Sequence, residues 1–169
     1  MTSEGKKILI IGGGSGMGRA IAHKLAKEKA IVSIAGRRKD NLLEVAKQCE
    51  QEITICPTDL TNRDSVADLF AWFDNEVGEI DVLINAAGIN IANRSMEELA
   101  PEEWDRVINI NLTGAYNCMK EALDRMRPRQ AGLIILINSV AGRRAIPLAG
   151  VAYNASKFGM SALGISVGE

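Results

Sequence analysis

Short apolar runs alternate with amphipathic segments along the whole chain. The runs are continuous in Ile, Leu and Val, which is typical of parallel strands buried on both faces. They predict strands at 8–11, 31–35, 53–56, 82–84 and 133–137. The segments between them repeat apolar residues every three or four positions, which indicates helices. This alternation predicts a single α/β domain, residues 1–169, of Rossmann type: a doubly wound parallel sheet in a three-layer αβα arrangement.

The predicted helices follow the strands in order. The first runs from the glycine-rich segment to about Lys29, and two more lie around 42–49 and 66–77. A long helix spans 112–126, and we expect Asn109 and Asn111 to precede it, where either could act as a cap. A final helix around 152–164 closes the chain. No repeat, low-complexity tract or linker divides the sequence.

Composition narrows the function classes. The formal net charge is -1, so neither a nucleic-acid footprint nor a patch for anionic membranes is indicated. No apolar run reaches membrane-spanning length, and the N-terminus has no signal core, so we expect a cytoplasmic protein. Cys49, Cys56 and Cys118 are far apart and odd in number. Their spacing predicts no metal site and no disulfide framework, only reduced packing residues.

Ligands of such sheets bind beyond the carboxyl ends of the strands. After the first strand comes Gly-Gly-Gly-Ser-Gly-Met-Gly, where glycines let a pyrophosphate approach the backbone and a helix N-terminus offers free N–H groups. The spacing is not G-x-G-x-x-G, because Met17 stands in place of the last glycine, and no P-loop Lys follows. We interpret the segment as a dinucleotide site rather than an ordinary turn. Its cofactor-binding residues are Gly12, Gly14, Ser15, Gly16, Met17 and Gly18.

Three further strand ends carry candidate cofactor contacts. Arg37 and Arg38 follow the second strand, where an acid would bind a ribose 2′-OH and an Arg a 2′-phosphate. The absence of an acid there favours NADP(H) over NAD(H), although the pair could also be solvated charges at a helix entry. The third strand is followed by Asp59 and Leu60. The fourth is followed by small residues that suit a backbone close to a flat ligand, or a simple turn: Asn85, Ala86, Ala87 and Gly88.

Candidate chemistry lies near the end of the chain. Tyr153 and Lys157 are four residues apart, so in a helix they share one face. An ammonium one turn away favours the phenolate, which lets a tyrosine exchange protons near neutral pH. Ser139 comes just after the fifth strand, where its hydroxyl can face that helix. Alone, the Tyr–Lys spacing is equally that of a solvated surface pair.

Taken together, these residues resemble the classical short-chain dehydrogenase/reductase family over the whole chain. Gly12-x-x-x-Gly16-x-Gly18 is similar to the family's cofactor loop, Asp59 to its adenine-contacting acid, and 85–88 to its Asn-Ala-Gly motif. The stretch from Glu103 to Gly114 resembles the segment holding the catalytic Asn. The remaining catalytic positions match as well, so the set implied by the resemblance is Asn111, Ser139, Tyr153 and Lys157.

The resemblance implies an NAD(P)-dependent oxidoreductase that interconverts a small-molecule carbonyl and a secondary alcohol by hydride transfer, with a 3-oxoacyl reductase-like activity as one form of that reaction. Tyr153 would exchange a proton with the substrate, Ser139 would orient the carbonyl, and Asn111 would hold a water linking Lys157 to solvent. Tyr153 and Lys157 would also contact the cofactor. The resemblance further implies a homo-oligomer, a tetramer or dimer, paired through the last two long helices. Their outward faces are expected to include Ala122, Met126, Ala162 and Val167.

Three departures from the family pattern stand out. Ile11 replaces a usual Thr, the segment from Ser139 to Tyr153 is one residue longer than common, and the chain stops at Glu169. Family members continue with two strands, a helix and a mobile segment over the substrate. We therefore expect an incomplete domain in which the strand at 133–137 becomes an apolar edge prone to aggregation. The expected pocket rim is Asn90, Ile91, Arg143, Arg144, Ile146 and Pro147.

Two alternatives to the oxidoreductase interpretation stay open. A family-shaped protein could bind the nucleotide without turnover, although the presence of Ser139, Tyr153 and Lys157 argues against that for an intact chain. A sugar-nucleotide epimerase or dehydratase of the extended relatives would prefer G-x-x-G-x-x-G, which the segment from Gly12 to Gly18 does not follow.

Overall fold

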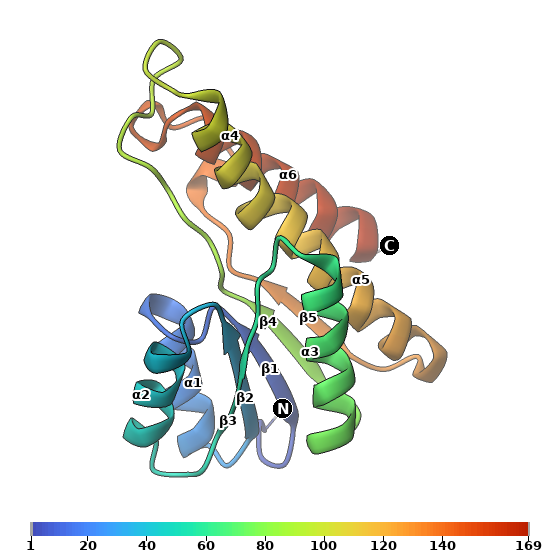
Figure 1. Cartoon of the computed structure of the whole chain (residues 1–169). Coiled ribbons are helices and arrows are strands. Elements are labelled where there is room, and N and C mark those ends of the chain that lie inside the picture. The colour runs from blue at the N-terminus through green and yellow to red at the C-terminus, as the bar shows by residue number, and fades with distance from the viewer. Residues whose placement is uncertain (1, 169) are drawn as a thin grey trace.

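Five parallel strands form one sheet in the order β3-β2-β1-β4-β5 (Figure 1). The computed structural model describes residues 2–168. Every predicted strand is present, with its ends shifted by at most one residue, and the order changes direction between β1 and β4, which creates the crevice expected of a doubly wound sheet. The strands are β1 (Lys7–Ile11), β2 (Ile31–Gly36), β3 (Thr54–Pro57), β4 (Val82–Asn85) and β5 (Leu133–Leu136).

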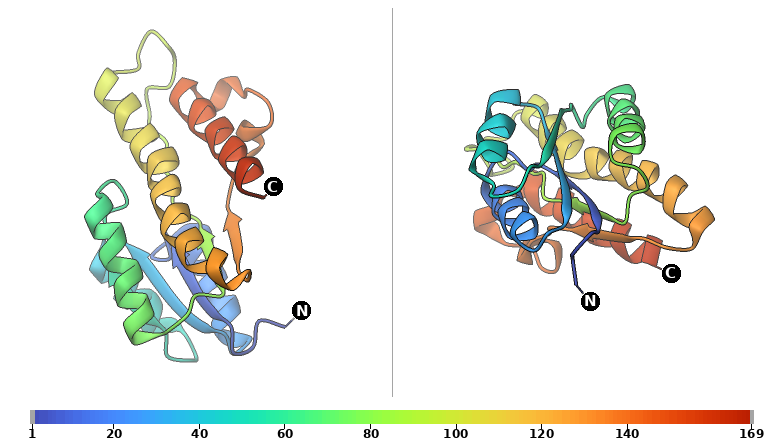
Figure 2. Two further views of the ribbon diagram at one scale, coloured as in Figure 1. Left: turned by 90° about the vertical axis from the view of Figure 1, so that its right-hand side faces the viewer. Right: turned by 90° about the horizontal axis from the view of Figure 1, so that it is seen from below.

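Helices cover both faces of the sheet, as Figure 2 shows. Residues of α1 and α2 pack with Ile8 and Ile10 on one face, and residues of α3 and α5 pack with Leu9 and Ile11 on the other. This division follows from the alternation of side chains along a strand. The bounds are α1 (Gly16–Lys27), α2 (Lys39–Gln48), α3 (Arg63–Glu76), α5 (Gly114–Met126) and α6 (Val151–Gly168). Three-residue 3₁₀ turns occupy 127–129, 140–142 and 147–149.

The long helix after β4 begins earlier than predicted. An additional helix, α4 (Pro101–Ile108), runs through a π-helical turn, Asn109–Thr113, into α5 as one rod. The expectation that Asn109 and Asn111 precede the long helix is therefore wrong, because both lie inside it. The physical reason is the packing of α4, whose Val107 is fully buried in a small cluster with Ile91 and Ala152 of α6.

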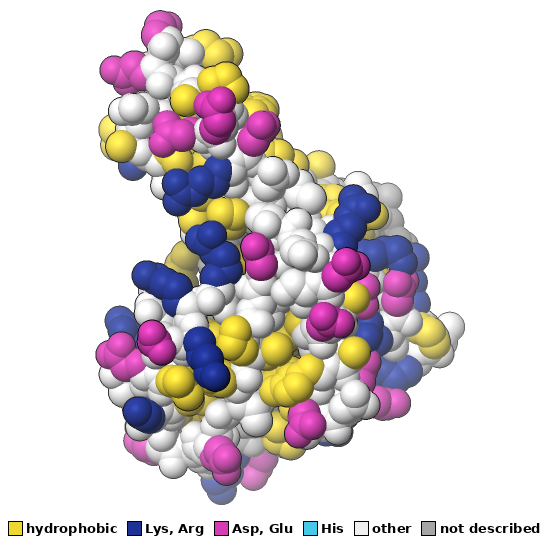
Figure 3. Space-filling model, in the orientation of Figure 1, with side chains coloured by type: hydrophobic (Ala, Val, Ile, Leu, Met, Phe, Trp, Pro, Cys, Tyr) yellow, Lys and Arg dark blue, Asp and Glu magenta, His cyan; other side chains and the backbone are white. Residues whose placement is uncertain are grey.

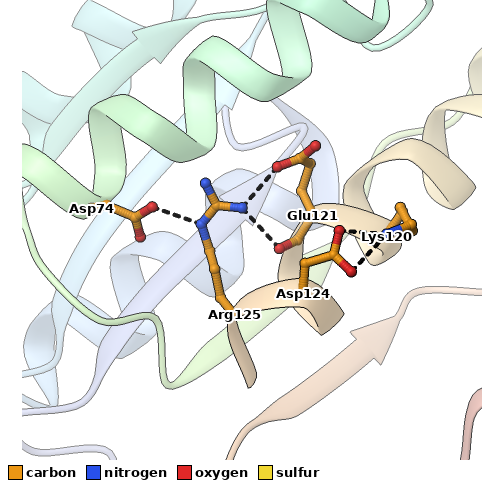
Figure 4. A network of polar contacts seen from close by, with 5 residues as sticks. All are labelled: Asp74, Lys120, Glu121, Asp124 and Arg125. Atoms are coloured by element: carbon orange, nitrogen blue, oxygen red, sulfur yellow. Dashed lines mark hydrogen bonds and ion pairs between the residues drawn. The ribbon is translucent and has the colours of Figure 1, made fainter. Parts of the chain in front are cut away.

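An ion-pair network joins α3 to α5 (Figure 4). Arg125 Nε donates to Asp74 Oδ2 at 2.7 Å, and its Nη1 donates to Glu121 Oε2 at 2.7 Å. The guanidinium also lies 5.2 Å from the centre of the Phe70 ring. These two carboxylates raise the pKa of Arg125, so the cation stays charged while its stem covers the aromatic core. The network holds the two helices in a fixed relation on one face of the sheet.

Strand β5 lies at the edge of the sheet, as expected for the run at 133–137. Leu133 is half exposed there. The prediction that Ala122 and Met126 face outward for assembly is wrong, because both are buried in the core beneath α5. Their positions follow the apolar stripe that packs on the sheet. Among residues 2–168, none of the helices is both long enough and apolar enough to cross a bilayer.

Candidate active site

The glycine-rich loop after β1 allows a close backbone approach. Gly12 has a φ of 78°, and a Cβ there would lie 2.8 Å from Ala87 N. A Cβ at Gly18 would collide with the Gly12 carbonyl. Only glycine fits these two positions. The turn leads directly into α1, whose N-cap residue, Ser15, makes no side-chain hydrogen bond to the first turn of the helix. The free N–H groups of the first turn suit a pyrophosphate.

A cleft of about 310 Å³ lies along the carboxyl ends of β1 to β4. Figure 3 shows this side of the molecule hollowed between its lower and upper parts, with Lys and Arg side chains gathered along the hollow. Most predicted cofactor residues meet in it: Gly12, Gly14, Ser15, Gly16, Met17, Arg37, Arg38, Asp59, Leu60, Ala86, Ala87 and Gly88. Gly18 and Asn85 are buried behind the wall rather than lining it. The elongated, glycine-walled cleft fits a dinucleotide.

The two arginines lie at one end of this cleft. Arg37 and Arg38 are exposed, and within the described residues neither pairs with a carboxylate. Nearby, Asp59 accepts hydrogen bonds from Thr61 N at 3.0 Å and Thr61 Oγ1 at 2.8 Å. These bonds lower the pKa of Asp59, and the Arg37 charge adds to the effect. This end of the cleft therefore offers two cations and one fixed carboxylate.

Asn85 shapes the turn that follows β4. Its side chain is buried and its Oδ1 accepts a hydrogen bond from Ala87 N at 3.1 Å. Its backbone carbonyl accepts from Ile137 N at 2.8 Å, which links β4 to the end of β5. Asn85 thus fixes the turn that carries Ala87 into the cleft wall, and a direct contact of its side chain with a ligand stays a prediction.

Tyr153 and Lys157 share one face of α6, as the spacing predicted. Lys157 Nζ lies 5.7 Å from the centre of the Tyr153 ring. The Lys157 side chain is only 3% exposed, and Nζ donates to Ile137 O at 3.2 Å and contacts Met160 Sδ at 3.3 Å. Burial lowers the pKa of this ammonium. A buried cation with so few partners is expected at a functional site rather than a structural one.

Asn111 ties the π-helical turn to both neighbouring segments. Its Oδ1 accepts from Ile89 N at 2.8 Å, and its Nδ2 donates to Ile89 O at 2.9 Å and to Ser156 Oγ at 3.1 Å. A Cβ at Gly88 would lie 3.6 Å from both Asn111 Oδ1 and Lys157 Nζ. Asn111 and Lys157 therefore face the same glycine of the cleft. A π-helical turn is often found at functional sites, and here it places this carboxamide.

Ser139 stands at the carboxyl end of β5. Its Oγ accepts a hydrogen bond from Ala141 N at 3.1 Å, and it caps the 3₁₀ turn at 140–142. Beside it, Asn138 Nδ2 donates to Ser161 Oγ of α6 at 2.8 Å. The segment after β5 is thus fastened to α6, the helix that carries Tyr153 and Lys157. Because Ser139 Oγ is the acceptor in its bond with Ala141 N, that bond does not use the hydroxyl proton.

Side chains hold the loop between Ser139 and α6 at several points. Asn154 accepts from Ile146 N at 2.8 Å and donates to Ile146 O at 2.9 Å and Gly150 O at 2.6 Å. From the segment after β4, Asn90 donates to Ala149 O at 3.0 Å, and Arg94 Nη1 donates to Leu148 O at 3.1 Å. We call residues 146–150 the lip.

The expected pocket rim stays a prediction, since none of its six residues lines the cleft. Asn90, Arg143, Arg144 and Pro147 are exposed in or beside the lip and Ile146 is half-buried there, whereas Ile91 is only 7% exposed and belongs to the cluster under α4. It is buried because α4, which the apolar pattern did not reveal, covers it.

Several site residues were missed at the sequence level. The cleft also includes Asn41, Leu42, Thr58, Ile89 and Ile110. Asn41 stands in the first turn of α2, three residues after Arg38, so its place soon after a strand end was a usable signal. Arg94 donates to a backbone carbonyl 54 residues away, and Asn154 binds backbone groups of the loop four to eight residues before it. No local pattern marks such residues.

The fold is a doubly wound α/β domain with a glycine-walled cleft along the carboxyl ends of its strands, with Lys157 beside Gly88 of that wall and Tyr153 next to Lys157 on α6. The sequence profile of the short chain dehydrogenase family matches residues 6–167. The chain belongs to the short-chain dehydrogenase family.

Individual relatives agree with this assignment. The chain is 39% identical to a 3beta-hydroxysteroid dehydrogenase of Mediterraneibacter gnavus (strain ATCC 29149), over 94% of this chain and 58% of the relative. It is 37% identical to an uncharacterized oxidoreductase of Staphylococcus aureus (strain MRSA252), over 84% of this chain and 62% of the relative. A short-chain type dehydrogenase/reductase from Mycobacterium ulcerans superposes with a TM-score of 0.90 at 27% identity, covering 96% and 61% of the two chains. The chain thus spans about three-fifths of the length of these relatives.

Proposed function

We propose that the protein is an NADP(H)-dependent oxidoreductase that interconverts a carbonyl and a secondary alcohol. The observation that carries this proposal is the placement of Lys157 and Asn111 beside Gly88 of the cleft wall, with the Tyr153 ring 5.7 Å from Lys157 Nζ on the same face of α6. A bound nicotinamide supplies or accepts the hydride. The residues of the chain position the cofactor and the substrate and transfer one proton.

Each catalytic side chain has a distinct role in this proposal. Tyr153 donates its phenolic proton to the substrate oxygen during reduction and takes it back during oxidation. Lys157, held by Ile137 O, places a positive charge beside the phenol and favours its deprotonated form. Ser139 donates its free hydroxyl proton to the same oxygen and fixes the carbonyl. Asn111 fixes Ile89 and α6 relative to each other, and we assign it the water that links Lys157 to solvent.

Tyr153→Phe tests the catalytic assignment. Phenylalanine keeps the ring and its packing but removes the proton, so turnover by the full-length protein is expected to fall about 10²–10⁴-fold. Cofactor affinity, measured by titrating the reduced cofactor, is expected to stay near the parent value. A variant that keeps more than about a tenth of the parent rate would exclude Tyr153 as the acid/base. A parent protein that binds the reduced cofactor but turns over none of the carbonyl substrates would favour the second candidate, a nucleotide-binding protein without turnover.

The preference for NADP(H) rests on Arg37 and Arg38, which are exposed in the cleft with no acid at the end of β2. A 2′-phosphate adds charge-assisted hydrogen bonds there, so NADPH is expected to bind about tenfold more tightly than NADH. Arg37→Asp should reverse the order, because a carboxylate repels the phosphate and accepts from a ribose 2′-OH. Calorimetric titration of both cofactors measures this. Equal affinities in the parent would refute the preference.

The substrate, assembly and location belong to the same proposal. One relative is named for 3β-hydroxysteroids, and the motifs are also those of 3-oxoacyl reductases, so these two classes lead the substrate screen. We propose a cytoplasmic homo-oligomer, a tetramer or dimer, paired through α5 and α6, where Ala162 is exposed and Val167 half-buried. A turnover screen of full-length protein over hydroxysteroids, 3-oxoacyl thioesters and sugars tests the substrate. Light scattering at micromolar concentration tests the assembly.

A further inference from the structure

The rod formed by α4, the π-helical turn and α5 carries two buried asparagines that hold backbone groups of the cleft wall. Asn111 binds Ile89 after β4, as described above. Asn117, which is 5% exposed, donates from Nδ2 to Leu60 O after β3 at 3.1 Å. One rod therefore grips the wall at two places, each just beyond the end of a strand.

Leu60 is the point where the rod meets the arginine end of the cleft. Its side chain is 6% exposed in the core beneath α3 and α5, while the residue also lines the cleft beside Asp59. A Cβ at Gly114 of α5 would lie 2.9 Å from Leu60 Cβ, so the helix approaches as closely as a glycine permits. The hydrogen bond from Asn117 to the Leu60 carbonyl and the close approach of Gly114 together fix the position of Leu60 relative to α5.

The turn that contains Leu60 has little else to hold it from outside. Among residues 2–168, the other hydrogen bonds of residues 59–62 stay within residues 59–66: Asp59 N donates to Ser65 Oγ, and Thr61 donates to the Asp59 carboxylate. Asn117 supplies the bond from a distant element, 57 residues along the chain. Without it, the turn could shift as a unit with the carboxylate that it carries.

We propose that Asn117 is a positioning residue for the adenosine half of the dinucleotide, acting through the carbonyl of Leu60. The inference rests on the proposed function, because it requires the cleft to bind a nicotinamide dinucleotide. The bond holds Leu60 and Asp59 at the adenosine end, while Asn111 holds Ile89 at the catalytic end. The spacing between the two ends of the cleft is thus set by one rigid helix.

The test compares ligands that contain only one half of the cofactor. In full-length protein, Asn117→Leu keeps a similar volume but leaves the Leu60 carbonyl without its donor. The dissociation constants of NADPH and of adenosine 2′,5′-bisphosphate, measured by calorimetry, are both expected to rise about threefold to tenfold. An equal factor for the two ligands locates the effect at the adenosine half. Asn117→Ala, which removes the same amide without adding branched methyl groups, should give the same shift.

Cys118→Ala is the matched control. Cys118 is fully buried in the next position of α5 and belongs to the same core cluster as Leu60, so its truncation loosens the helix but leaves the hydrogen bond from Asn117 Nδ2 to Leu60 O in place. It should lower thermal stability and leave both dissociation constants unchanged. Folded Asn117 variants that bind like the parent, or a Cys118→Ala variant that weakens binding equally, would overturn the inference alone. A parent protein that binds neither ligand would overturn the proposed function together with it.

Discussion

Lys157 is a charged residue buried in the folded protein with few polar partners. It is 3% exposed, and its ammonium has one carbonyl and one thioether as neighbours. Because burial lowers its pKa, the unfolded chain holds this proton more tightly than the folded one. Below the lowered pKa, the buried ammonium is charged in the folded state and lowers the free energy of unfolding by its full amount. The free energy of unfolding then rises with pH between the lowered pKa and the ordinary value of 10.5.

Lys157→Met is therefore expected to stabilise the fold while abolishing turnover. Methionine removes the charge and packs beside Met160, and replacing buried charged groups by apolar ones can stabilise a protein by about 1–2 kcal/mol. Urea unfolding at pH 7 should show this gain in the free energy of unfolding. The gain should shrink as the pH rises from the lowered pKa towards 10.5, because the parent lysine is neutral in both states only above that value. A variant less stable than the parent at pH 7 would contradict the argument.

The control is Lys120→Met. Lys120 is an exposed lysine paired with Asp124 one turn away on α5. Exposed pairs of this kind contribute little, so the change in stability should stay within about 0.5 kcal/mol.

Residues whose partners are local were the predictable part of the site. Tyr153 and Lys157 meet because they lie one turn apart in a single helix, and Gly12 and Gly18 meet within one turn of the chain. Asn117 donates to the Leu60 carbonyl in the turn after β3, and Asn154 accepts from Ile146 N across a loop. Nothing in their neighbourhood in the sequence distinguishes such asparagines from ordinary polar positions.

At the scale of elements, the strands were predictable because buried parallel strands are uninterrupted apolar runs. The helix α4 was missed although Pro101 stands at its first position and Glu102 and Glu103 occupy its first turn, which are recognised start signals. The π-helical turn had no such signal. It depends on the different partners of α4 and α5, which are α6 and the sheet, and these appear only in three dimensions.

The lip is an element held by side chains, and Asn154→Ala should release it. The substitution removes three hydrogen bonds, to Ile146 N, Ile146 O and Gly150 O. Local opening then costs less free energy, so trypsin should cleave after Arg143 or Arg144 about tenfold faster under native conditions. Fragment mass and the rate of cleavage measure the effect.

Asn62→Ala provides the comparison for this prediction. Asn62 caps α3 by accepting from Asp64 N and Ser65 N, far from the lip, so its loss destabilises the protein without touching residues 146–150. If both variants were cleaved equally fast after Arg143 or Arg144, global unfolding would explain the result and the loss of the Asn154 hydrogen bonds to the lip would not.

At the scale of the whole molecule, β5 is an edge strand of the sheet that carries an exposed apolar side chain, Leu133. An apolar edge pairs readily with other chains. Leu133→Glu places a charge on this edge and should slow aggregation of residues 1–169, followed by light scattering. Ile31→Glu makes the same change in net charge at a similarly exposed position of interior strand β2, since Leu133 is 50% and Ile31 47% exposed. Equal slowing by the two variants would attribute the effect to net charge alone.

The π-helical turn has a consequence for how this molecule tolerates insertions and deletions. A π turn contains one residue more than an α-helical turn, and one residue corresponds to about 100° of rotation about the helix axis. The extra residue therefore sets the phase between α4, which faces α6, and α5, which faces the sheet. Substitutions at Leu112 or Thr113 would leave that phase intact. Deleting a single residue from Asn109–Thr113 would restore a regular helix and rotate one half away from its partner, separating the catalytic end of the cleft from the adenosine end.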